Sequence, residues 1–473
     1  MADEIIDDEY EETAELGLGT LPLVQRIVVR GLHGRANYDL DLLTKNKNGN
    51  VSLLYGDNGT GKTTILRLLW DLLSPAPNRG HRSRIAKVAF ARFAVYLSDS
   101  TEIRATRKLP GTGPYRIEVR RNGKVQSQSA WPTVGVYEKY LKTVPPSEWS
   151  SLRETNDPEI VRAVEQAKAE SHYLNHINSF GASPYFLADT RTTSSDEVEE
   201  DVLYSDRQRR MHVAQNDSEH PRGFTNPLAL ELDQAMRQVN SDFRRITLGG
   251  SVQGSAGANS VYMDVISQLA NTSHLETDAS LTRKELVTRV EAVGKRNALF
   301  ASLDLVPPFS TTNFVANVKA VDGENLAIVQ SIVDPFLQSL AARLDALEDA
   351  RVLIQTLLDE ANQYLVDKRV TYRRRALRVE LLDETPLKTD QLSSGECHLL
   401  LLLLNAVLAG GKARLFIIDE PELSLNVKWQ RRIVRSLSSL TAGTGLQFVL
   451  ATHSIELLSG YRDRVVRLAP VSP

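Results

Sequence analysis

The sequence predicts an α/β fold in which a mixed, mainly parallel sheet is flanked by helices and joined by an antiparallel β lobe and a helical insertion. Three observations lead to this fold class. A glycine-rich loop stands between an apolar strand pattern and a helical pattern, and two later apolar strand patterns end in Asp419-Glu420 and in His453. Ligands of open α/β sheets bind outside the carboxyl ends of the strands, so we expect these polar residues to meet at one edge.

The glycine-rich loop has the phosphate-binding pattern G-x-x-x-x-G-K-T. A strand pattern at 51–55 precedes it and a helical pattern at 64–70 follows it, which is the context that such a loop requires. Its glycines let backbone N–H groups surround a triphosphate, its lysine reaches the β and γ oxygens, and its last threonine binds Mg²⁺. A chance glycine turn is the alternative, and the flanking patterns argue against it. The predicted nucleotide contacts are Gly56, Asp57, Asn58, Gly59, Thr60, Gly61, Lys62, Thr63 and Thr64.

Composition excludes several classes of protein. The chain has 473 residues and a net charge of −3, so no global basic field indicates a nucleic-acid partner. A single cysteine, Cys397, excludes an internal disulfide and a cysteine-rich zinc site and fits a reducing cytoplasm. Residues 1–20 are acidic and unlike a signal peptide, and the apolar run 399–409 is too short to span a bilayer. We therefore expect a cytoplasmic protein without a membrane segment.

The first part of the chain alternates strand and helix patterns. Residues 24–43 predict two strands, and 85–130 predict a β-meander with a hairpin turn at Asn122-Gly123. Residues 145–178 read as helical, and the apolar run 184–188 reads as a buried strand that ends at Asp189.

The middle of the chain predicts helices separated by polar loops. Loops are expected at 190–225 and 247–260, with helices at 228–245, 281–300 and 325–366. The last helix spaces Phe336, Leu340, Leu344 and Leu347 as an amphipathic stripe. An antiparallel helical hairpin, in the form of a short coiled coil, and an ordinary helix packed on the body both fit this pattern.

Three patterns near the C-terminus complete the predicted site. The continuous apolar run before Asp419-Glu420 suits a central parallel strand, where Asp419 can hold Mg²⁺ and Glu420 can act as general base on the attacking water. The run 447–452 reads as another such strand and places His453 as a sensor of the γ-phosphate, although a lone histidine more often simply faces solvent.

The third pattern is a serine-rich turn before a long apolar helix. Ser393, Ser394 and Gly395 offer hydroxyl and N–H groups at a helix N-terminus, which can bind phosphate. Plain helix capping by serine with a glutamate beyond it is the alternative. The turn lies 22 residues before the Asp-Glu strand pattern, and this position favours the phosphate site.

In this order, the four motifs resemble those of an ABC-type ATPase head, above all the SMC/RecF-like and OLD-like "AAA family" ATPases of prokaryotes, many of which occur in phage-defence systems. The resemblance covers 22–75 and 385–470, and 185–191 resemble the strand and polar residues that follow the Q-loop region of that group. Ser394 stands where transporters usually carry glycine, and Asn426 stands where this group often carries aspartate.

The resemblance implies that two subunits sandwich two ATP molecules. Ser393 and Gly395 of one subunit would touch the γ-phosphate held by Lys62 of the other, and Glu420 would catalyse the hydrolysis that releases the dimer. We therefore expect a Mg²⁺-dependent ATPase that forms a homodimer or higher homo-oligomer. It would act in anti-phage defence or DNA repair and maintenance, and control a separate effector chain such as a nuclease or toxin.

The spacing of the motifs bears on two other functions. An ATP-binding subunit of an ABC transporter is the main alternative, but Ser393 follows Lys62 by 331 residues, a far longer interval than such subunits use. An OLD-type nuclease would need a further domain, and twenty residues follow His453, so nuclease activity in this chain is not expected.

Two basic clusters make DNA a possible partner. Dense positive charge can bind phosphate backbones, but a solvated or salt-bridged face explains it equally well. The clusters are Lys368, Arg369, Arg373, Arg374, Arg375 and Arg378, and Arg79, Arg82, Arg84, Lys87 and Arg92.

The motifs also predict how the chain is divided into domains. We expect an acidic disordered tail at 1–20, the first part of the ATPase head at 21–190, a mainly helical insert with mobile loops at 191–370, and the second part of the head at 371–473.

Overall fold

The computed structural model describes residues 23–42, 50–76, 80–131, 158–181, 183–188, 193–194, 227–270, 282–321 and 326–469. The chain forms two compact units. The head unit comprises Met1–Leu228 and Ser394–Pro473, and the insert unit comprises Ala229–Ser393. The sequence placed the limits of the insert at 190/191 and 370/371, and its acidic tail lies outside the described residues.

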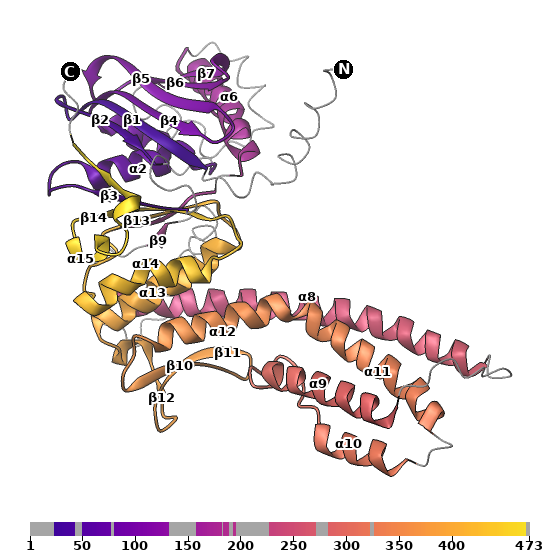
Figure 1. The fold of residues 1–473 in the computed structure, drawn as a ribbon. Helices are drawn as coiled ribbons and strands as arrows, with labels where there is room; N and C mark the ends of the chain where they lie inside the picture. Colours follow the sequence, from indigo (N-terminus) through magenta and orange to yellow (C-terminus); the bar gives the residue numbers. More distant parts are fainter. Residues whose placement is uncertain are drawn as a thin grey trace, which may run out of the picture. The chain divides into compact units, whose positions relative to one another are not determined.

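A mainly parallel sheet forms the centre of the head unit (Figure 1). All neighbouring strands pair in parallel except the last pair, which is antiparallel. Every residue of the strand that ends at Asp419 is buried, which explains its unbroken apolar sequence. The strand order is β15 (Val465–Arg467), β3 (Val51–Tyr55), β14 (Gln447–Thr452), β13 (Leu415–Asp419), β8 (Tyr185–Leu187) and β9 (Thr193–Ser194).

A second, antiparallel sheet supplies the predicted β lobe. Its order is β2 (Ala36–Asp41), β1 (Val24–Leu32), β4 (Phe90–Leu97), β5 (Thr101–Gly111), β6 (Tyr115–Arg121) and β7 (Lys124–Trp131). The hairpin at Asn122-Gly123 is confirmed: both residues are left-handed, with φ of 49° and 79°, as a two-residue type I′ turn requires. The predicted meander begins later than expected, because residues 81–87 form helix α3 (His81–Lys87).

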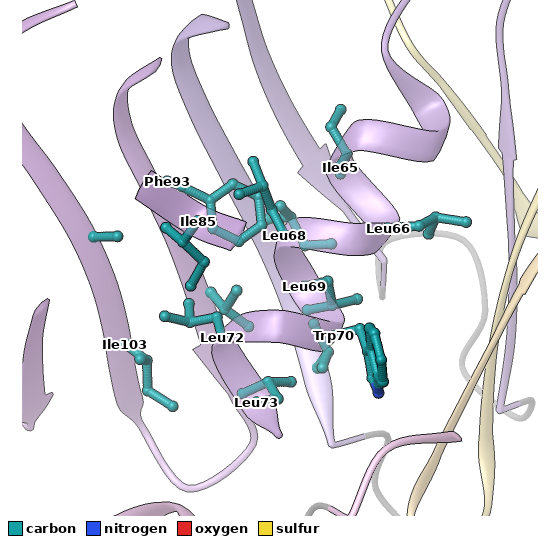
Figure 2. Close-up of a cluster of buried hydrophobic side chains, with 14 of the residues drawn as sticks. Ile65, Leu66, Leu68, Leu69, Trp70, Leu72, Leu73, Ile85, Phe93 and Ile103 are labelled. Atoms are coloured by element: carbon teal, nitrogen blue, oxygen red, sulfur yellow. The ribbon is translucent and has the colours of Figure 1, made fainter. Parts of the chain in front are cut away.

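Helix α2 (Lys62–Leu73) is buried on nearly all sides and joins the two sheets. Figure 2 shows its side chains in one cluster with Phe93 and Ile103 of the antiparallel sheet. On another side, Trp70 stacks on Phe186 of β8 at 5.3 Å between ring centroids. An all-round apolar helix belongs in a core. The other head helices are α6 (Pro158–Ser179), α13 (Ser394–Gly410), α14 (Val427–Leu440) and α15 (Ile455–Leu458).

The insert unit is helical with a small antiparallel sheet. Helix α9 packs on α10 and on α11 around Leu286, Val290 and Leu337. Thr282 and Glu285 form a capping box that fixes the start of α9. The elements are α8 (Pro227–Ala270), α9 (Arg283–Ala301), α10 (Thr311–Ala320), α11 (Leu326–Ala346), α12 (Glu348–Asn362), β10 (Lys368–Arg373), β11 (Ala376–Leu381) and β12 (Pro386–Leu387).

One prediction about the insert was wrong and another is confirmed only in part. The loop expected at 247–260 is part of α8, which runs without a break from Pro227 to Ala270. Glycine weakens a helix by about 1 kcal/mol relative to alanine, but such propensities are weak and helical sequence on both sides outweighs them here. Of the predicted stripe, Leu344 and Leu347 are buried, but Phe336 is exposed. Val333 and Leu337 fill the three-helix cluster instead.

Candidate nucleotide-binding and catalytic site

The phosphate loop connects β3 to α2, as its sequence predicts. Gly61 precedes the helix with φ of 89°, and a Cβ atom there would lie 2.8 Å from Leu32 Cδ2. Lys62 is 5% exposed, and its Nζ donates to the carbonyl oxygens of Gly56 at 2.7 Å and Asp57 at 3.2 Å. The ammonium group therefore points into the loop, where the phosphates of a nucleotide would lie.

Side chains from the antiparallel sheet hold this loop, and the sequence motifs gave no indication of them. Tyr38 of β2 donates its hydroxyl to the carbonyl oxygen of Thr60 at 2.7 Å. His33, in the β1–β2 turn with φ of 51°, places Nε2 3.5 Å from Thr64 Oγ1. The loop is thus shaped by contacts from residues more than twenty positions earlier in the chain.

The end of β13 brings the two predicted carboxylates to the same edge. Asp419 is the last residue of the strand and is buried. Glu420 leaves the strand with φ of 55°, and its N–H donates to the carbonyl oxygen of Ala451 at 2.9 Å. The left-handed backbone of Glu420 ends the strand and turns the side chain out of the sheet. The hydrogen bond to β14 fixes the position of this turn.

The surroundings of Glu420 raise its pKa. Burial raises the pKa of Glu420, and the charge of Glu422 raises it further. The charges of His453 and Lys62 act in the opposite direction and only partly offset these effects. A carboxylate with a raised pKa is suited to accept a proton, which is the property that a general base needs.

His453 completes this group at the end of β14. Its Nδ1 is paired with Glu420 Oε2 and lies 3.3 Å from Glu422 Oε1. One donor atom from each of these three side chains falls within 4.8 Å of the others. The structure therefore brings together the phosphate loop, Asp419-Glu420 and His453, which the sequence had joined only by inference.

The donor set at this edge fits Mg²⁺. Thr63 stands at the start of α2 and offers a hydroxyl oxygen, and Asp419 offers a carboxylate that is 2% exposed. Hard divalent cations prefer such oxygen ligands. Thr63 and Asp419 remain our prediction for the metal ligands.

The serine-rich turn is placed differently from the other three motifs. Ser393 and Ser394 are exposed, and α13 begins at Ser394. A Cβ atom on Gly395 would lie 2.7 Å from the carbonyl oxygen of Ser424, so glycine is needed for this close approach. The turn thus packs beside the segment that follows Asp419-Glu420, and Asn426 in that segment caps α14 by accepting from Trp429 N at 3.0 Å.

The strand order explains how these motifs form one site. Strand β14, which leads to His453, lies between β3, which leads to the phosphate loop, and β13, which leads to Glu420. With an antiparallel sheet beside it and the signature turn before α13, this is the architecture of an ABC-type P-loop ATPase head. The described part of the chain therefore has the fold of such a head, as the motifs indicated.

Comparison with known proteins agrees with this class. A family model described as "AAA domain, putative AbiEii toxin, Type IV TA system" matches residues 314–459, less than half of the chain. The matched segment contains the signature turn, Asp419-Glu420 and His453, and not the phosphate loop.

Curated relatives share a shorter segment. Two proteins named "Phosphonates import ATP-binding protein PhnC", from Lactobacillus johnsonii and Lactobacillus gasseri, are each 32% identical over 89 residues, which is 19% of this chain. That segment covers 34% and 33% of those proteins, so this chain spans about a third of the length of the curated relatives it matches.

Among solved structures, an Smc head domain from Pyrococcus furiosus with an extended coiled coil, bound to the C-terminal domain of ScpA, covers 96% of this chain and 97% of its own. It has 12% identity and a TM-score of 0.39. An SmcHead bound to the C-winged helix domain of ScpA has 11% sequence identity and a TM-score of 0.38. That match covers 95% of this chain and 98% of the other. Such TM-scores do not define a shared fold, so the class rests on the strand order and the site.

Proposed function

We propose that this chain binds and hydrolyses ATP and works as a cytoplasmic switch that dimerises around the nucleotide. The observation that supports this most is the meeting of Lys62, Glu420 and His453 at the carboxyl edge of one parallel sheet. A triphosphate cradled by the phosphate loop would present its γ-phosphate to this edge.

Each side chain then has a defined task. Lys62 and the N-terminus of α2 bind the phosphate oxygens, and Glu420 accepts the proton of the attacking water. His453 holds Glu420 on one side and faces solvent on the other, where it can contact the γ-phosphate. Bound between Thr63 and Asp419, Mg²⁺ would neutralise charge that develops on the β and γ oxygens.

The exposed signature turn supports a dimer with ATP at the interface. Ser393 and Ser394 are exposed, while Gly395 packs against Ser424. The exposed start of α13 is therefore accessible to the triphosphate of a second subunit. Because both subunits would contact the γ-phosphate, ATP would stabilise the dimer, and hydrolysis would allow the two subunits to separate.

The biological setting that we propose is anti-phage defence or DNA repair, with a separate effector chain under control of the ATP state. The family model that matches residues 314–459 names a putative toxin of a toxin–antitoxin system, which favours the defence setting. Among the described residues, none of the helices is both long and apolar enough to cross a membrane.

Burial and ion pairs engage several arginines of the two basic clusters. In the second basic cluster, Arg82 is buried, Arg84 pairs with Asp71 and Arg92 pairs with Glu102. In the first cluster, Arg369 and Arg373 pair with Glu384. The hairpin turn leaves Arg374 and Arg375 exposed, and no ion pair of their side chains is found within the described residues. A DNA surface would therefore centre on these two arginines.

An ATP-binding subunit of an importer is the second candidate function, favoured by the similarity to the two import ATP-binding proteins. The insert unit, Ala229–Ser393, weighs against it, because it separates the phosphate loop from the signature turn by far more residues than such subunits use. Copurification with a membrane-spanning subunit would favour this candidate.

The experiment that tests the proposed function is ATP turnover by purified protein with Mg²⁺. Lys62→Ala removes the ammonium group that points into the phosphate loop, so we expect turnover and ATP binding to be lost. Lys108→Ala, an exposed lysine on β5, is the matched control and should turn over ATP as the wild type does. Wild-type turnover by Lys62→Ala would contradict the assignment.

A further inference from the structure

A buried carboxylate lies beside the proposed general base, and the sequence motifs assign it no role. Glu422 is 5% exposed and follows Glu420 by two positions. Its Oε1 accepts hydrogen bonds from Thr452 Oγ1 at 2.5 Å, His453 N at 2.9 Å and Ser454 N at 3.1 Å. Hydrogen bonds to an ionised acceptor are stronger than those to a neutral one. A single oxygen atom therefore fixes the backbone that carries His453.

The same turn is also held from the other side. Ser454 Oγ donates to Gln430 Oε1 at 2.7 Å and accepts from Leu457 N at 3.2 Å, which caps α15. Ser454 N also lies 2.9 Å from Thr452 Oγ1. These contacts do not involve Glu422, so its replacement should loosen the turn at His453 without unfolding the end of β14.

Glu422 also acts on the imidazole of His453. Nδ1 of this ring is paired with Glu420 Oε2, and Glu422 Oε1 is 3.3 Å away on the same side. With Nδ1 directed at the carboxylates, Nε2 is the ring nitrogen left for a nucleotide. The position of Glu422 thus selects which nitrogen faces the general base and which can face the γ-phosphate.

We propose that Glu422 is a positioning residue for ATP hydrolysis, which holds the Thr452-His453-Ser454 turn and directs His453 Nδ1 to the general base. The proposal rests on the proposed function and adds to it a residue that does not touch the nucleotide.

A metal ion held by Glu420, Glu422 and His453 is the rival explanation of this cluster. Glu422 Oε1 already accepts three hydrogen bonds, and imidazole paired with carboxylate accounts for the close approach of His453. We therefore favour the positioning role. Protein purified with one tightly bound transition-metal ion that is lost in Glu422→Gln would overturn it.

Two variants test whether the acceptor oxygen of Glu422 positions the turn. Glu422→Gln keeps an oxygen that can accept from His453 N and Ser454 N but removes the charge. We expect its kcat to fall by less than about tenfold. Glu422→Ala also removes the acceptor, so kcat should fall on the order of 10²-fold, while the Kd for ATP changes less than about twofold.

Glu118→Gln is the matched control, because Glu118 is a buried carboxylate of the same unit that pairs with Arg104 far along the antiparallel sheet. It should leave kcat unchanged. A purely structural role for Glu422 would lower the fraction of protein that binds ATP in Glu422→Ala, with kcat per binding site unchanged, and would overturn the proposal. Turnover that does not depend on Lys62 would instead contradict the proposed function, and this result can be distinguished from a failure of the Glu422 proposal alone.

Discussion

Gln447, the first residue of β14, forms two hydrogen bonds with the backbone of Val24, the first residue of β1. Val24 N donates to Gln447 Oε1 and Gln447 Nε2 donates to the carbonyl oxygen of Val24, both at 2.8 Å. Both residues are essentially inaccessible to solvent. The side-chain amide of Gln447 thus forms the two hydrogen bonds that the backbone of a neighbouring strand would form. It joins the antiparallel sheet to the parallel sheet that carries the site.

This link predicts a large effect on stability. Gln447→Leu would leave the N–H and carbonyl groups of Val24 buried without partners, which should lower the free energy of unfolding by about 2–4 kcal/mol. Denaturant unfolding would measure it. Gln126→Leu, an exposed glutamine on β7, is the control and should change stability by less than about 0.5 kcal/mol. Equal effects of the two substitutions would contradict the link.

The pH dependence of turnover follows from Glu420. Its raised pKa means that the carboxylate, the form that accepts a proton, is lost at a higher pH than for an ordinary glutamate. On acidification, kcat should therefore begin to fall at a higher pH than the ordinary glutamate pKa of about 4.3 would give. Steady-state turnover at saturating ATP would show this limb, with ATP binding at each pH as the control for folding. A kcat that is constant down to that pH speaks against Glu420 as the base.

The insert unit contains a pH-sensitive carboxylate of its own. Glu231 on α8 has an Oε2 atom without a partner among the described residues, and burial raises its pKa to about 7. The folded protein therefore binds this proton more tightly than the unfolded chain, so stability falls as pH rises from the ordinary glutamate pKa through about 7. Glu231→Gln should melt at a higher temperature than the wild type at about pH 8.5, and the difference should shrink at about pH 4. A difference that is the same at both values would refute this.

The proposed DNA surface can be tested through charge. Arg374→Gln combined with Arg375→Gln should weaken DNA binding and reduce the slope of log affinity against log salt by about 2. Arg369→Gln is the control, because Glu380 and Glu384 already pair with this arginine. Fluorescence anisotropy over a salt series would measure both variants. If the double variant binds as the wild type does, the hairpin is not the DNA site.

The motif residues could be predicted from the sequence because each depends on its immediate neighbours. The phosphate loop needs a strand before it and a helix after it, and Asp419-Glu420 needs an unbroken apolar strand; both patterns are local. Tyr38 and His33 were missed because they reach the loop from another sheet. Glu422 was missed because its partners, Thr452 to Ser454, lie about thirty residues further on.

The errors in the insert have a different cause. Glycine and serine between 247 and 260 suggested a loop, but local propensity did not decide the state of α8. The stripe on α11 was read from one helix alone, and which of its apolar residues are buried depends on α9 and α10. Here tertiary packing supplied information that spacing along the chain does not contain.

The central claim, that ATP joins two heads through the signature turn, is tested most directly by sedimentation of Glu420→Gln. Without its base this variant should bind ATP and not hydrolyse it, so its mass should rise from that of one 52.6 kDa chain to that of two when ATP and Mg²⁺ are added. Adding Ser393→Arg should abolish the increase. A mass that is the same with and without ATP, although ATP is bound, would contradict the account.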